Sequence, residues 1–250
     1  MASKKTWIIF SLFIALALSV APNVSAKKFW DSNSFTLLMG NDYKVGDESR
    51  WVLTYEHVSG HSWGDLFLFY DRLDSDNGDL ETYGEISPRL AIFNQSAKDD
   101  QFLGKVYIAA TMEMGAYVQS SGGFSNAATN YLIGLGTDLS IPNFAYVQVN
   151  LYKRNNDKGE SSWQLTPVWG LPFTLGKATF LYDGFADWVA ATDNSSASLN
   201  FTSQLKLDVG AYWDNPKAFY IGVEYNYWVN KFGISGVDER NPNLLLKAHF

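Results

Sequence analysis

The feature that most constrains this chain is a strict alternation of apolar and polar residues over long segments. In LNFTSQLKLDVGAYW at 199–213, one face is mainly leucine, phenylalanine, valine and tryptophan, and the other is mainly polar. Such alternation predicts a β-strand with one apolar and one polar face. The segment is longer than the usual strand of about 5–6 residues, whereas a tilted strand that crosses a membrane needs about 9–11. The pattern therefore predicts strands that span a membrane.

The same alternation recurs along the chain, separated by stretches rich in turn-forming residues. We expect strands at 34–41, 50–59, 65–73, 82–93, 103–118, 129–140, 143–153, 161–170, 177–190, 199–213, 218–229 and 243–250. An even number of antiparallel strands can close without leaving an unpaired edge in lipid. The predicted fold class is therefore all-β, a twelve-stranded antiparallel transmembrane β-barrel of the bacterial outer membrane. SIPNF at 140–144 and the link at 213–217 are predicted to be tight periplasmic turns.

The N-terminal segment has the pattern of a secretory signal peptide. Lys4 and Lys5 precede the apolar run WIIFSLFIALALSVA at 7–21, and small residues follow up to Ala26. A spanning helix needs about 20 apolar residues, which favours a cleaved signal over the alternative of a membrane anchor. We expect residues 1–26 to be the signal peptide and residues 27–250 to form the barrel.

Composition limits the function further. The formal net charge is −7 and there is no basic block, which argues against nucleic-acid polymers as partners. Cysteine is absent, and aromatic residues make up 16% of the chain, which favours rings at the membrane–water boundary. With three histidines and no nucleophile elbow, we expect no enzymatic activity, no cofactor and no metal site.

The last eight residues, NLLLKAHF, read as a final strand. Leu244, Leu246, Ala248 and Phe250 form its predicted lipid face, and Lys247 and His249 are predicted to point into the lumen. In a closed barrel this strand pairs with the first one, which holds the C-terminus in place. A terminal phenylalanine on an alternating strand is similar to the C-terminal signal that the outer-membrane assembly machinery reads, so we expect that machinery as a partner during biogenesis.

The polar faces of the predicted strands supply the candidate site. Mixed charges in a narrow lumen set a transverse field, and tyrosines offer flat faces to a ring-shaped solute. The alternative is a closed interior network in which Arg89 and Lys206 neutralise carboxylates. The predicted pore-lining residues are Glu56, Tyr83, Glu85, Arg89, Tyr107, Glu113, Asp138, Gln148, Asn150, Asp183, Lys206, Asp208, Tyr212 and Glu224.

Several segments carry a family resemblance in the same order along the chain. They are WGDLFLFYDRLD at 63–74, YGEISPRLAIF at 83–93, KVYIAATMEMGAY at 105–117, NYLIGLGTDLSIP at 130–142, SWQLTPVWGLPF at 162–173 and FLYDGFADW at 180–188. The chain resembles the nucleoside-specific channel-forming outer-membrane proteins, a family that includes the vibrio phage-receptor porins. The resemblance implies a twelve-stranded barrel with a narrow pore and phage-binding outer loops.

Two functions follow as hypotheses. The first is a monomeric outer-membrane channel of a Gram-negative bacterium for passive passage of small polar solutes, with nucleosides as candidates. The alternative is a surface receptor or adhesion barrel, for example for phage, with a closed lumen. In both cases the expected surroundings are outer-membrane lipid and lipopolysaccharide.

Overall fold

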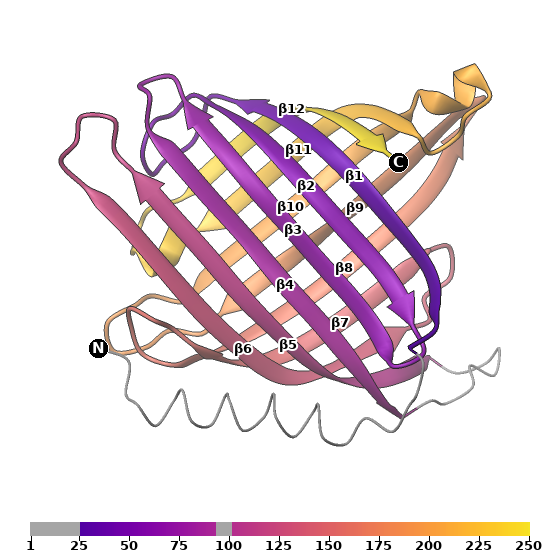
Figure 1. Ribbon diagram of the computed structural model, residues 1–250, viewed down its shortest axis with the longest axis horizontal. Coiled ribbons are helices and arrows are strands. Elements are labelled where there is room, and N and C mark those ends of the chain that lie inside the picture. Colours follow the sequence, from indigo (N-terminus) through magenta and orange to yellow (C-terminus); the bar gives the residue numbers. More distant parts are fainter. Residues whose placement is uncertain (1–25, 94–101) are drawn as a thin grey trace.

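The computed structural model describes residues 26–93 and 102–250 and forms a closed antiparallel barrel of twelve strands (Figure 1). Each strand pairs with its neighbours in the sequence, and β12 closes the barrel on β1. This confirms the predicted fold class. The strands are β1 (Lys28–Gly40), β2 (Arg50–His61), β3 (Gly64–Ser75), β4 (Leu80–Phe93), β5 (Leu103–Val118), β6 (Ser125–Leu139), β7 (Tyr146–Asn155), β8 (Ser162–Leu175), β9 (Ala178–Val189), β10 (Ser198–Asp208), β11 (Phe219–Val229) and β12 (Glu239–His249).

Helical structure in the described residues is confined to two short 3₁₀ turns, η1 (Gly210–Trp213) and η2 (Lys231–Gly233). Within those residues no helix is long and apolar enough to cross a membrane. The predicted signal peptide falls almost entirely on residues 1–25, which lie outside the described part of the chain, so it stays a prediction.

In the ladder between β1 and β12 that closes the barrel, residues predicted to face lipid are on the outer side and Lys247 is on the inner side. Leu37 lies opposite Leu246. Leu244 and Phe250 are exposed on the outer face, at 51% and 70%, whereas Lys247 is 4% exposed on the inner face. The amide of Phe250 donates to the Asn33 carbonyl at 3.0 Å, so the last residue extends the ladder beyond β12.

The two ends of the barrel differ in what they carry. The end with residue 27 and Phe250, called here the terminal end, holds the turns 62–63, 140–145, 176–177 and 209–218. The opposite end, called the loop end, holds the connections 41–49, 76–79, 119–124, 156–161, 190–197 and 230–238.

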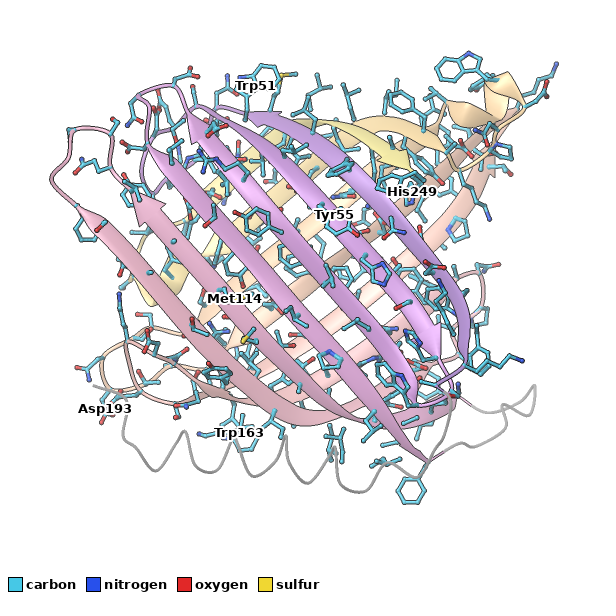
Figure 2. All side chains as sticks on the ribbon, viewed as in Figure 1. Trp51, Tyr55, Met114, Trp163, Asp193 and His249 are labelled. Atoms are coloured by element: carbon cyan, nitrogen blue, oxygen red, sulfur yellow. The ribbon has the colours of Figure 1, made fainter. Side chains whose placement is uncertain are left out.

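Exposed aromatic side chains lie on the outer surface near both ends, as expected at the two membrane–water boundaries. Trp51 and Trp163 are each about half exposed near the loop end, far from His249 at the terminal end (Figure 2). Trp213 and Phe250 occupy the terminal end.

The predicted strand at 199–213 is wrong in its last residues. Strand β10 ends at Asp208, whose carboxylate accepts hydrogen bonds from the Ala211 amide at 3.1 Å and the Lys217 amide at 2.8 Å. These bonds cap the turn that contains η1. Tyr212 therefore lies in η1 and is 58% exposed, so it is not on the inner face of a strand as predicted.

Other strand boundaries also differ from the prediction. Strand β1 begins at Lys28 instead of 34, and β12 begins at Glu239 instead of 243. Pro242 favoured a loop because proline cannot donate to a β-ladder. In the structure it pairs with Tyr225 on one side only, since the β1–β12 ladder reaches no further than Met39 and Leu244.

A first prediction concerns the C-terminal ring. Phe250 stacks on Phe35 with ring centroids 5.5 Å apart at the closing seam. Phe250→Ala is expected to destabilise the barrel by about 1.5–3 kcal/mol, the value of burying a phenylalanine side chain in an apolar setting. Urea unfolding of the protein refolded into phospholipid vesicles measures the change. Phe250→Trp is the control, because an interfacial ring is retained; equal stability of both variants would contradict a role for the stack.

Candidate functional site

The barrel lumen is the candidate site, and the strand registers identify the side chains that face it. Residues directly opposite each other in an antiparallel ladder share one face. Lys247 Nζ lies 2.9 Å from Glu56 Oε1, although β1 separates their strands, so both point inward. Following the registers from this pair brings these predicted residues to the inner face: Glu56, Tyr83, Glu85, Arg89, Tyr107, Glu113, Asp138, Gln148, Asn150, Asp183, Lys206, Asp208 and Glu224.

One cluster on the inner face is built around Arg89, which is 4% exposed. Its guanidinium makes a two-point contact with Asp65, at 2.8 and 2.6 Å, and a third contact with Asp138 at 3.0 Å. Tyr107 donates its hydroxyl to Asp138 at 2.6 Å and lies beneath the guanidinium, 4.1 Å from the ring centroid. Bidentate and stacked contacts fix the geometry of arginine, so this part of the wall is rigid.

A second cluster joins β5, β6, β7 and β8. Arg154 contacts both carboxylate oxygens of Glu113, with Nη2 at 2.5 Å from Oε2, and also reaches Gln164 Oε1 at 2.8 Å. Asn130 donates to the same glutamate at 2.9 Å. Arg154 is absent from the predicted pore-lining residues because it stands at a strand end, at the start of the turn-rich stretch RNNDKG. The alternation that places Asn150 and Tyr152 inward also extends to Arg154.

A third group lies toward the terminal end. Lys206, 1% exposed, contacts Asp183 Oδ2 at 2.6 Å and Gln204 Oε1 at 2.9 Å. Gln204 in turn donates to Glu224 at 2.8 Å. Arg89 and Lys206 therefore form ion pairs with inner carboxylates, as in the alternative of a closed interior network.

Several inner carboxylates lack such a cation, and three of these accept a hydrogen bond from a hydroxyl group instead. Asp71 accepts from Thr54 at 2.6 Å, Glu85 from Tyr83 at 2.7 Å, and Asp187 from Thr166 at 2.5 Å. None of the three takes part in an ion pair within the ranges 26–93 and 102–250. An ionised carboxylate has about four acceptor sites, so each of the three keeps acceptor capacity for a solute with donor groups.

The inner surface carries an excess of negative charge. The strand carboxylates that face inward outnumber the inward-facing strand cations, which are Arg50, Arg89, Arg154, Lys206 and Lys247. The carboxylates are Glu56, Asp65, Asp71, Glu81, Glu85, Glu113, Asp138, Asp183, Asp187, Asp208, Glu224 and Glu239. A lumen of this composition favours neutral or cationic solutes over anions.

The surroundings of several charged and polar groups near the loop end also shift the pKa values of these groups. Burial raises the pKa of Tyr43 and lowers the pKa of Lys231. A hydrogen bond from Tyr117 is the main cause that lowers the pKa of Asp79 to about 2. At neutral pH Tyr43 therefore keeps its proton and Asp79 is ionised.

The sequence also matches known proteins. The model of the family described as nucleoside-specific channel-forming protein, Tsx, matches residues 27–242. "Outer membrane protein OmpK" of Vibrio parahaemolyticus serotype O3:K6 (strain RIMD 2210633) is 26% identical over 224 residues, which cover 82% of this chain and 80% of that protein. A second Vibrio parahaemolyticus OmpK is 24% identical over 185 residues, or 71% of this chain and 66% of its own length.

Among solved structures, the KdgM porin in complex with disordered oligogalacturonate is similar in fold, with a TM-score of 0.50 and 11% sequence identity. The superposition covers 88% of this chain and 99% of the porin. The matching family is one of channel-forming proteins. Because the family model spans most of the sequence, this chain belongs to the nucleoside-specific channel-forming protein family, Tsx, and is an outer-membrane channel for small solutes.

Proposed function

We propose that the solutes of this channel are nucleosides, which cross the lumen by passive diffusion. The observation that carries the proposal is the composition of the inner surface, where carboxylates outnumber cations and tyrosine rings are interspersed among them. Tyr83 and Tyr107 each hold a carboxylate through the hydroxyl. A nucleobase can stack on such a ring, and ribose hydroxyls can donate to carboxylates such as Asp71 and Asp187.

Charge separates nucleosides from their phosphorylated forms. A nucleoside is neutral, whereas a nucleoside monophosphate carries an anionic group into a lumen lined by an excess of carboxylates. Like charges at close range in a poorly hydrated pore repel strongly. The proposal therefore predicts a preference for nucleosides over nucleotides that have the same base and sugar.

Planar-bilayer recordings of the refolded protein test this proposal. Discrete ion-conducting channels are expected, and added adenosine should reduce the current in a concentration-dependent way. Adenosine 5′-monophosphate at the same concentration is the matched control and should reduce the current much less. A complete lack of conductance would contradict channel activity, and equal block by both compounds would contradict nucleoside selectivity.

The biological setting is proposed from the outer surface. We infer a monomer whose apolar outer face contacts lipid and lipopolysaccharide, supported by exposed outward residues such as Leu53 and Leu205. Phe250, directly after the closing strand, supports recognition by the assembly machinery during insertion. The receptor alternative with a closed lumen is not favoured, since the family match points to a channel.

A further inference from the structure

The connection between β1 and β2, residues 41–49, follows the inner side of β12. Successive residues of this segment bind inward-facing side chains of β12. The Asp42 amide donates to Asn241 Oδ1 at 3.1 Å, and the Lys44 amide donates to Glu239 Oε2 at 2.9 Å. Between them, Tyr43 donates its hydroxyl to Asn243 Oδ1 at 3.0 Å. All three β12 side chains are at most 1% exposed.

Tyr43 is the most buried residue of this segment, at 8% exposure. It packs in one buried cluster with Leu38, Val52 and Leu245, which face inward from β1, β2 and β12. Arg50 lies over the Tyr43 ring, 4.8 Å from its centroid. These apolar side chains form one cluster at the inner side of β1, β2 and β12. The cluster packs against the Tyr43 ring inside the barrel.

A second contact holds the segment from the side of η2. Lys231 Nζ binds both carboxylate oxygens of Glu239, at 2.7 and 2.6 Å, and lies 5.7 Å from the Tyr43 ring centroid. Asn230 and Phe232, on either side of Lys231, adopt left-handed backbone conformations with φ of 48° and 57°. Such conformations cost energy for residues other than glycine and persist where surrounding contacts enforce them. The contacts of Lys231 thus retain this strained turn.

Arg50 anchors the other end of the segment. Its Nη1 contacts Glu81 Oε2 at 2.8 Å, and its Nε donates to the Asp47 carbonyl at 2.9 Å. Arg50 is 5% exposed. Residues 41–49 are thus fixed at both ends and along their length, which distinguishes a built element from a loose surface loop.

We propose that segment 41–49 is the constriction of this channel and that the Tyr43 ring sets the size limit for solutes. The proposal rests on the passage of solutes proposed above and adds the residue that restricts it. The segment occupies space on the β12–β1–β2 side of the lumen near the loop end. By contrast, the connection 156–161 carries exposed residues such as Asp157 and Lys158. We therefore expect Tyr43, and not residues of that second loop, to control the size of the opening.

Single-cysteine chemistry tests the proposal, because the chain has no cysteine of its own. Tyr43→Cys removes the ring and is expected to raise single-channel conductance and to admit larger sugars in liposome-swelling assays. Reaction with benzyl methanethiosulfonate attaches a new aromatic ring at the same place and should lower the conductance again. A reducing agent should then reverse that loss. Heat-modifiable migration in gels verifies that each variant is folded.

Lys158→Cys is the matched control, since the same reagent adds the same ring at the same end of the barrel. Its conductance should not respond to modification. If Tyr43→Cys does not fold, Lys44→Cys replaces it: this residue is exposed within the segment, and a bulky adduct there should reduce conductance.

The possible results distinguish a failure of the proposed constriction from a failure of the proposed function. A conducting wild type with a Tyr43→Cys channel of unchanged conductance and no response to the reagent overturns the constriction alone. A wild type without conductance contradicts the proposed passage of solutes. In that case, a conducting Tyr43→Cys variant still supports the constriction, and a variant that is also closed overturns both.

Discussion

Replacing Arg154 with methionine is expected to lower the free energy of unfolding by about 3–5 kcal/mol, the effect of removing one partner from a buried ion pair. Arg154 is the cation that binds Glu113, which is 5% exposed. Without it the glutamate keeps a buried charge that the Asn130 amide alone cannot compensate. Glu85 lies directly opposite Glu113 in the β4–β5 ladder, so two carboxylates would then face each other without a cation.

Arg72→Met is the control for this prediction. Arg72 also pairs with a carboxylate, that of Asp74 at 3.0 Å, but both side chains are substantially exposed, at 40% and 59%. Exposed pairs contribute about 0–1 kcal/mol, so this variant should unfold nearly like the wild type. Urea titration followed by tryptophan fluorescence measures both. Similar losses in the two variants would mean that the contacts of Arg154 do not stabilise the barrel.

The inner face of the barrel could be predicted from the sequence where a strand is apolar on one side and polar on the other. Strands β10 and β12 have this form, and their ladders place Lys206, Asp208 and Lys247 on the inner face. Strands β3 and β9 are apolar on both sides, because Phe67 and Phe185 point inward beside aspartates. Alternation is weak there: Asp183 is among the predicted residues, but Asp71 and Asp187 are not.

The loops and turns could not be predicted in the same way, because long-range contacts determine them. Nothing in NDYKVGDES indicates that Tyr43 enters the lumen, since its partner Asn243 lies at the other end of the chain. The end of β10 also depends on hydrogen bonds from the Ala211 and Lys217 amides to Asp208. The alternation of apolar and polar residues does not predict such bonds. Periodicity predicts the face of the sheet on which a residue lies, whereas the conformation of a loop depends on side-chain partners that can be distant in the sequence.

A pair of arginine substitutions at adjacent positions tests the assignment of faces directly. Leu205 is 48% exposed on the outer face of β10, and Gln204 faces inward beside Glu224. Leu205→Arg places a cation in the apolar band, where it costs about 2–4 kcal/mol at mid-bilayer depth. We therefore expect insertion of this variant into phospholipid vesicles to fall sharply.

Gln204→Arg introduces the same cation one residue earlier, where Glu224 and Asp183 can pair with it. This variant should insert and unfold almost like the wild type, as measured by heat-modifiable migration and urea titration. Because the two substitutions share one strand and one chemistry, only the direction of the side chain differs between them. Folded Leu205→Arg together with unfolded Gln204→Arg would mean that the inner and outer faces of β10 are reversed. Every lumen residue assigned through its ladders would then have to be reassigned to the lipid face.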